Sequence, residues 1–313
     1  MIEITDLVKF YGDKKAVDHI SFTVKKGEVL GFLGPNGAGK STTLNIIAGY
    51  LSSTSGSVKV NGHDILEQPV EAKKCIGYLP EIPPLYPDMT VMEYLKFICD
   101  LKGVEKKGRN EMLASILAMV KITDVADRLI ANLSKGYKQR VGIAQALIGN
   151  PEILILDEPT VGLDPSQIIE IRKLIKHLAQ DRTIILSSHI LSEVQAVCDR
   201  VVIINRGKLV AQDTINELSG KISGSSKIIL CFKGPSDSVV NTLKNVSGID
   251  RVSLTASEND IHRLELTAVN GDDGIDIRGR IFYAMANAGW PILEFRSKEP
   301  SLEEIFLKLT GQN

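Results

Sequence analysis

The residues best suited to chemistry lie in the stretch GPNGAGKSTT, which runs from Gly34 to Thr43. Its Gly-x-x-x-x-Gly-Lys-Ser spacing lets backbone N–H groups point inward at phosphate oxygens, because glycine accepts conformations that other residues avoid. In such a loop Lys40 reaches the outer phosphates of a nucleotide, and the hydroxyl of Ser41 binds Mg²⁺. The sequence therefore predicts a phosphate-binding loop with these members: Gly34, Pro35, Asn36, Gly37, Ala38, Gly39, Lys40, Ser41 and Thr42.

The neighbours of this loop support the assignment. The apolar run VLGFL precedes it, and LNIIAGYL, which has helical spacing, follows it. A helix that begins at the loop presents the positive end of its dipole to a bound anion. A glycine-rich turn with an unrelated lysine would not require this strand-loop-helix order.

A second apolar run, ILILDEP, ends in two acidic residues. At the end of a buried parallel strand, the carboxylate of Asp157 is placed to hold Mg²⁺, usually through water. The adjacent Glu158 can polarise an attacking water molecule. By themselves these residues would be read as two solvated acids, but together with the phosphate loop they predict a nucleotide-hydrolysing site.

The elements that must position these motifs alternate between strands and helices. Strand patterns cover residues 2–11, 18–28, 28–34, 55–65, 152–159, 183–188, 201–207 and 208–213, and helical spacing covers about 89–130, 167–180 and 190–200. Strands that alternate with helices predict a parallel sheet covered by helices, which is an α/β fold.

The Ser- and Gly-rich stretch LSGKISGSSK, Leu218 to Lys227, predicts a linker to a second unit. Beyond it, the patterns follow the order β-α-β-β-α-β, which matches the ferredoxin-like motif. That unit shows no metal cluster, catalytic constellation or ligand motif in its sequence. Packing and regulatory roles both remain open for it, because a fold does not define a function.

Composition limits the possible functions. The 313 residues suit two domains. The near-balance of 37 Lys and Arg against 38 Asp and Glu argues against a protein whose main task is neutralising nucleic-acid phosphates. No apolar run approaches the roughly 20 residues of a transmembrane helix, and the alternating N-terminus is unlike a secretory signal. We therefore expect no nucleic-acid partner, and a membrane role only through another chain.

Five motifs in one order, GPNGAGKST, LSKGYKQR, LILDEP, VGLDP and LSSH, resemble the nucleotide-binding subunit of an ABC transporter. The resemblance implies an ABC-type ATPase domain of the P-loop NTPase class over residues 1–218, with a helical subdomain at about 83–140. A linker over 219–226 and a C-terminal α+β accessory domain over 227–313 would complete the chain. ATP and Mg²⁺ are the implied cofactors, and a homodimer of ATPase subunits on a polytopic membrane subunit is the implied assembly.

The same resemblance assigns roles to individual residues. Tyr11 would stack on adenine, for which a core tyrosine at a strand edge is the alternative. Ser134 and Gly136, in the signature LSKGY, would contact the γ-phosphate held by the other protomer. Asp164 matches the loop that crosses the dimer interface, and His189 matches the histidine that senses the γ-phosphate.

The chain departs from the family pattern at two places. In the signature, usually Leu-Ser-Gly-Gly-Gln, Lys135 replaces the first Gly and Tyr137 replaces Gln. The second departure is Glu81, which stands where the family usually has a Gln that ligates Mg²⁺. A carboxylate oxygen is also a hard ligand, but it adds negative charge beside the triphosphate. The hypothesis is that Glu81 ligates Mg²⁺ and makes ATP binding more dependent on the metal; a solvent-facing Glu81 is the alternative.

The segments GYLPE, LSKGYKQR and PSLEEIFLKLTG resemble ATPase subunits of bacterial exporters whose membrane subunit is a separate chain. This implies export powered by ATP-driven dimer closure at the cytoplasmic face of the cell membrane. One alternative is a soluble ABC-type ATPase acting on ribosomes or DNA, which the single cassette and the short spacing between motifs disfavour. Another is a nonhydrolytic ATP-sensing scaffold, which the presence of Glu158 and His189 disfavours.

Overall fold

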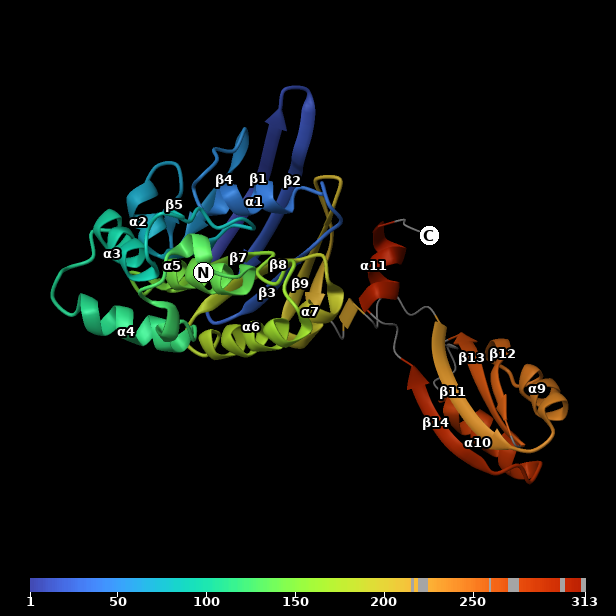
Figure 1. The fold of residues 1–313 in the computed structure, drawn as a ribbon. Coiled ribbons are helices and arrows are strands. Elements are labelled where there is room, and N and C mark those ends of the chain that lie inside the picture. Colours follow the sequence, from blue (N-terminus) through green and yellow to red (C-terminus); the bar gives the residue numbers. More distant parts are fainter. Residues whose placement is uncertain (215–216, 219–224, 259, 270–275, 299–301, 311–313) are drawn as a thin grey trace. The chain divides into compact units, whose positions relative to one another are not determined.

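The computed structural model describes residues 1–214, 217–218, 225–258, 260–269, 276–298 and 302–310 (Figure 1). Contacts divide the chain into two compact units, Met1–Ile215 and Asn216–Asn313. Most of the predicted linker, 219–224, lies outside the described residues. Ser225 and Ser226, its next two residues, belong to the first strand of the second unit.

A six-stranded sheet in the order β10-β9-β3-β8-β7-β6 forms the centre of the first unit. Its strands are β3 (Val29–Leu33), β6 (Ile76–Leu79), β7 (Ile153–Asp157), β8 (Thr183–Ser188), β9 (Arg200–Asn205) and β10 (Lys208–Thr214). Adjacent strands pair in parallel from β6 to β9, and β10 is antiparallel to β9. The predicted parallel sheet is confirmed.

Both faces of this sheet are buried, because successive side chains of a strand point to opposite sides. Ile153, Ile155 and Ile185 belong to the hydrophobic core that also contains residues of α1 (Lys40–Ile47). Leu154, Leu156 and Leu186 belong to the core that contains α5 (Lys135–Leu147) and α6 (Pro165–Leu178). The continuous apolar runs in the sequence follow from this two-sided burial.

A second, antiparallel sheet packs over the α1 side. Its order is β2-β1-β4-β5, with β1 (Ile2–Tyr11), β2 (Lys14–Val24), β4 (Ser55–Val60) and β5 (His63–Asp64). Phe22 of β2 stacks on Phe32 of β3, with ring centroids 5.5 Å apart, and so joins the two sheets. The β1–β2 hairpin places Tyr11 at its turn.

The predicted helical block contains α3 (Val91–Leu101), α4 (Arg109–Met119) and two short 3₁₀ helices, Thr123–Val125 and Ile130–Asn132. Thr90 begins α3 with a capping box: its hydroxyl accepts the N–H of Glu93 at 3.2 Å, and the Glu93 carboxylate accepts the N–H of Thr90 at 2.8 Å. Buried side chains of α3 and α4 share one core with α5, so this block positions the signature motif.

Two short elements of the first unit, α2 (Pro69–Lys74) and β6, fall where no element is predicted. Each has too few residues for a periodic pattern to be distinguished from chance. After β8, α7 (Leu191–Val197) leads to β9, as the spacing predicts.

The second unit has the predicted ferredoxin-like topology. Its antiparallel sheet has the order β12-β13-β11-β14, and α9 and α10 connect the strands at the predicted places. The elements are β11 (Ser225–Lys233), α9 (Ser236–Lys244), β12 (Ile249–Glu258), β13 (Ile261–Val269), α10 (Ile277–Asn287), β14 (Ile292–Lys298) and α11 (Leu302–Thr310). Leu230, Phe232 and Met285 lie in a core of its own.

Because each unit has its own core, we predict that the two unfold separately. Leu230→Ala should destabilise only the second unit, and Leu154→Ala only the first, each by about 2–5 kcal/mol, since both leucines are fully buried. Calorimetry of the full chain should show two transitions, of which each variant lowers one. A single transition lowered equally by both variants would contradict the division.

Candidate active site

The phosphate loop lies between β3 and α1 and packs closely against neighbouring backbone. A Cβ on Gly34 would lie 2.4 Å from the carbonyl oxygen of Ile204. Gly39 has a φ of 107° and begins α1, and a Cβ there would lie 2.5 Å from the carbonyl oxygen of Ala16. At both positions only glycine fits, so packing against the neighbouring backbone by itself requires these residues.

Lys40 is the first residue of α1 and is 6% exposed. Its ammonium lies inside the loop, where Nζ donates hydrogen bonds to the carbonyl oxygens of Gly34 at 2.9 Å and Pro35 at 3.5 Å. It also lies 3.7 Å from Oε1 of Glu158. The loop therefore surrounds a buried positive charge whose carboxylate partner comes from another strand.

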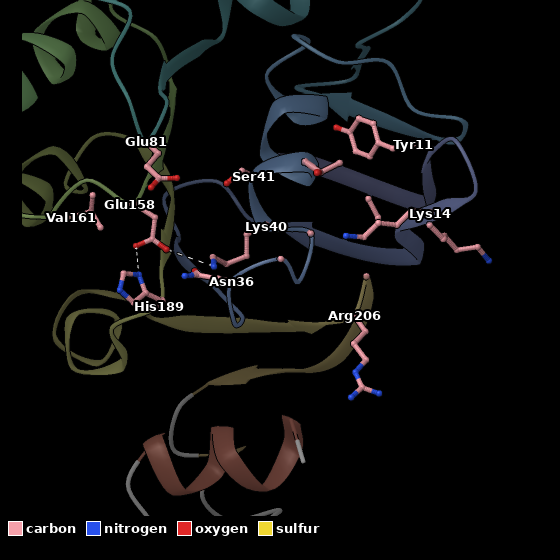
Figure 2. A pocket seen from close by; sticks show the side chains of 16 residues that line it. Tyr11, Lys14, Asn36, Lys40, Ser41, Glu81, Glu158, Val161, His189 and Arg206 are labelled. Atoms are coloured by element: carbon pink, nitrogen blue, oxygen red, sulfur yellow. Dashed lines mark hydrogen bonds and ion pairs between the residues drawn. The ribbon is translucent and has the colours of Figure 1, made fainter. Parts of the chain in front are cut away.

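Glu158 follows β7 directly and is 6% exposed. Its φ of 49° is unusual for a residue with a side chain, and its N–H donates to the carbonyl oxygen of Ser187 at 3.2 Å and to Ser187 Oγ at 3.1 Å. Its Oε2 is hydrogen-bonded to Nδ1 of His189 at 2.8 Å. Figure 2 shows Glu158 between His189 and Lys40, with one carboxylate oxygen toward each.

A cavity of about 860 Å³ opens beside these side chains. Figure 2 shows Tyr11 at the opposite end of the cavity from His189. Most predicted site residues line it, namely Tyr11, Asn36, Gly37, Gly39, Lys40, Ser41, Thr42, Glu81, Glu158 and His189. The structure thus brings together residues that are up to 178 positions apart, Tyr11 and His189.

Four predicted residues close to these do not line the cavity. Gly34, Pro35 and Ala38 instead shape the loop, in which Ala38 N–H donates to the carbonyl oxygen of Pro35 at 3.1 Å. Asp157 is 1% exposed and accepts a hydrogen bond from Ser187 Oγ. It therefore lies behind Glu158, outside the cavity lining.

Ser134, Gly136 and Asp164 lie at two helix starts away from the cavity lining. Ser134 Oγ accepts the N–H of Tyr137 at the start of α5. Asp164 begins α6, and the hydrogen bonds from Ser166 Oγ and from the N–H of Gln167 lower the pKa of its carboxyl. A Cβ on Gly136 would lie 2.7 Å from the Gln167 side chain, so the two helix starts are neighbours.

The structure adds cations that sequence reasoning missed. Lys14 and Lys15, the first two residues of β2, and Arg206, on the β9–β10 turn, line the cavity at its Tyr11 end. Lys15 is paired with Asp18 at 2.8 Å, and Arg206 extends away from the phosphate loop (Figure 2). Only the charges in YGDKK and NRG signal them in the sequence, and such turns are common at surfaces.

Tyr11 offers a half-exposed ring at this end of the cavity. Its residue is 49% exposed, and Lys9 Nζ lies 5.5 Å from the ring centroid. Lys9 is itself held by a hydrogen bond to the carbonyl oxygen of Ser52 at 2.8 Å. The ring is thereby fixed while part of it remains open to a planar ligand.

In the sheet, the phosphate loop follows β3, His189 follows the adjacent strand β8, and the buried Glu158 follows β7, which lies beyond β8. This arrangement defines a P-loop nucleotide hydrolase. The sequence profile described as ABC transporter matches residues 17–161. The chain is 34% identical to the linearmycin resistance ATP-binding protein of Bacillus subtilis (strain 168), covering 100% of this chain and 99% of the relative. It is 36% identical to the bacitracin transport ATP-binding protein of Bacillus licheniformis, covering 99% and 97%.

Solved structures agree. A structure of the ATP-binding subunit of an ABC transporter is 30% identical, has a TM-score of 0.66, and covers 71% of this chain and 93% of that chain. A dimeric cassette in a post-hydrolysis state bound to ADP and Pi is 26% identical with a TM-score of 0.63, covering 69% and 99%. The chain belongs to the ATP-binding subunits of ABC transporters, and it is an ATPase.

ATPase subunits of this family dimerise and work with membrane subunits. Among the residues that the structure describes, no helix is both long enough and apolar enough to cross a bilayer.

We predict that Gly39→Ala lowers ATP affinity at least about tenfold, because the added Cβ must displace the loop from Ala16. Gly62→Ala is the matched control, since Gly62 also has a positive φ, 86°, but no atom within 4 Å of the added Cβ. Binding of a fluorescent ATP analogue would be measured for both. Equal affinity losses in the two variants would show that the contact with Ala16 is not responsible.

Proposed function

We propose that this chain hydrolyses Mg²⁺–ATP to power export through a separate polytopic membrane subunit. The observation that carries the proposal is the series Lys40, Glu158 and His189, of which the first two are buried, at one end of a cavity that has Tyr11 at the other end. A nucleotide with its base on Tyr11 would direct its terminal phosphate toward Glu158. Both ends of the cavity therefore match one extended ligand.

In the proposed reaction, Glu158 polarises the attacking water for in-line attack on the γ-phosphate. His189 is hydrogen-bonded to Glu158, so it orients that carboxylate and meets the transferred phosphoryl group from the same side. Lys40 and the N–H groups of the loop stabilise the charge on the phosphate oxygens. Burial of Lys40 and Glu158 strengthens these interactions, because little water screens them.

The residues present also fit Mg²⁺. Ser41 and Glu81 line the cavity from α1 and from the segment after β6, and Figure 2 shows their oxygens pointing toward each other. Hydroxyl and carboxylate oxygens are the ligands that Mg²⁺ prefers, and Asp157, one residue before Glu158, would act through water. When bound, the metal supplies positive charge to the phosphate oxygens.

We propose a homodimer as the active assembly. Ser134, Gly136 and Asp164 lie away from the cavity of their own chain, so they would act on ATP held by a second copy. The N-terminus of α5, capped by Ser134, would face that γ-phosphate. The dimeric cassette among the similar structures supports this arrangement. ATP binding would close the dimer and hydrolysis would reopen it.

The names of full-length relatives favour export as the transport direction. They include the linearmycin resistance and bacitracin transport proteins and a Nod factor export ATP-binding protein of Burkholderia orbicola (strain AU 1054), 31% identical over 99% of this chain. The proposed location is the cytoplasmic face of the cell membrane, reached through the membrane subunit. A net charge of −1 disfavours the alternative of a soluble ATPase acting on ribosomes or DNA.

We predict that Glu158→Gln lowers ATP turnover at least about 100-fold but leaves ATP binding intact, because the amide cannot polarise water while the loop remains unchanged. Phosphate release and nucleotide binding would be measured on the full chain. Glu105→Gln, on an exposed residue outside the cavity, is the matched control. Undiminished turnover in Glu158→Gln would contradict the proposed role.

The same variant tests the membrane partner, because ATP that is bound but not hydrolysed should hold the dimer closed. Tagged Glu158→Gln would be purified from its native cells in mild detergent, and the chains that accompany it would be identified by mass. A stoichiometric polytopic membrane protein is expected. Ribosomal or DNA-associated partners without a membrane chain would favour the soluble ATPase instead.

We predict that Glu81→Gln makes ATP binding less dependent on Mg²⁺. Loss of the carboxylate charge removes its repulsion of the metal-free triphosphate. The affinity for ATP in EDTA should therefore rise several-fold, which corresponds to roughly the repulsion energy of one solvent-screened pair of charges. Affinity with saturating Mg²⁺ should change less. Titrations with and without metal would be compared with Glu105→Gln. An unchanged ratio of the two affinities would contradict a role of Glu81 in metal binding.

A further inference from the structure

The contact between Glu158 and His189 is not determined by the sheet alone. The parallel pairing of β7 and β8 ends with Asp157 opposite Ser187. Glu158 and His189 both lie beyond that pair, in segments that turn away from the strands. Besides the hydrogen bonds from the N–H of Glu158 to Ser187, a further connection joins the two segments past the end of the sheet.

Glu193, on α7, makes that connection. It is 2% exposed, and its Oε2 accepts hydrogen bonds from Thr160 Oγ1 at 2.5 Å and from Ser188 Oγ at 3.1 Å. Thr160 lies two residues after Glu158, and Ser188 lies directly before His189. One carboxylate oxygen thus joins the segment that carries Glu158 to the segment that carries His189.

Ser188 also links Glu193 to the residue that follows His189. Its Oγ donates to Glu193 and accepts the N–H of Ile190 at 3.0 Å, so hydrogen bonds hold the residues on both sides of His189. On the other segment, the N–H of Val161 donates to the carbonyl oxygen of Glu158 at 3.2 Å and closes a turn that contains Thr160. Both turns are therefore fixed relative to one buried carboxylate.

Packing alone does not account for a glutamate here. Within the described residues, Oε1 of Glu193 is buried without a hydrogen-bond partner, and the guanidinium of Arg172 on α6 lies 4.0 Å from it. A buried carboxylate that is satisfied at only one oxygen destabilises a fold relative to an apolar side chain of the same volume. The hydrogen bonds that its other oxygen accepts, in contrast, favour one arrangement of the groups that they join.

We propose that Glu193 is a positioning residue that, through Thr160 and Ser188, holds Glu158 and His189 at their working separation. It acts on the hydrolytic step and not on ATP binding, because the phosphate loop and Tyr11 are held by other elements. The proposal rests on the proposed roles of Glu158 and His189 in hydrolysis.

Thr160→Val tests this with little change of shape. It removes the hydroxyl that donates to Glu193 and keeps the side-chain volume. Thr183→Val is the matched control: Thr183 is a buried threonine at the opposite end of β8, 2% exposed, whose Oγ1 accepts the N–H of Gly27 at 2.9 Å. The two variants each remove one hydrogen bond of a buried threonine, but only Thr160 contacts the network.

For Thr160→Val we expect kcat to fall about tenfold, the rate equivalent of one hydrogen bond, with the KM and Kd for ATP within about twofold of the parent. Thr183→Val should lower Tm about as much as Thr160→Val does, but it should leave kcat unchanged. Glu193→Gln, whose amide oxygen can still accept from Thr160 and Ser188, should keep more of kcat than Glu193→Ala. Circular dichroism would check that each variant is folded.

The proposal is overturned if the two threonine variants lose kcat equally, if Thr160→Val acts on KM or Kd, or if Glu193→Gln is no better than Glu193→Ala. Glu158→Gln in the same assay separates this result from the proposed function. If it abolishes turnover while the threonine pair fails the test, the positioning role alone is wrong. If it leaves turnover intact, both proposals are overturned.

Discussion

The parallel pairing of three buried strands is the constraint on which the site depends. Leu33, the last residue of β3, pairs with Ser188 of β8, and Asp157, the last of β7, pairs with Ser187. The phosphate loop, Glu158 and His189 therefore all follow the carboxyl ends of adjacent strands. Open parallel sheets bind ligands at these ends. A slip of one residue in either pairing would turn the flanking side chains to the opposite face and separate Lys40 from Glu158.

Burial at this edge makes the charges of the site depend on one another. Lys40 and Glu158 are each 6% exposed, and either charge alone would be costly there, so each serves as the counter-ion of the other. In the proposed reaction, the triphosphate enters as a competing anion for Lys40. That competition would weaken the hold of Lys40 on Glu158 and leave the carboxylate to the attacking water.

The sequence reveals those parts of the site that are local in the chain. The phosphate loop could be predicted because strand, glycines, lysine and helix follow one another within a few residues. The Glu158–His189 contact could be anticipated only through family resemblance, because it depends on strand order, which periodicity does not reveal. Short elements such as β6 and α2 have no readable period, and the cations Lys14 and Arg206 lie at or beside turns whose sequences are common at surfaces. The hydrogen bonds of Glu193 join three segments, and no spacing in the chain signals them.

The chain also separates two groups of residues that the proposed dimer would reunite. Ser134 and Gly136 lie beside the start of α6, and Lys135 Nζ lies 2.1 Å from where a Cβ on Gly162 would stand. Gly162 and Asp164 belong to the same short segment as Glu158 and Thr160. The signature of one chain therefore packs on the segment that carries its own Glu158, and that segment is held by Glu193. In the proposed dimer, the helix start that meets the phosphate of the second copy would therefore be a direct neighbour of the segment that carries Glu158.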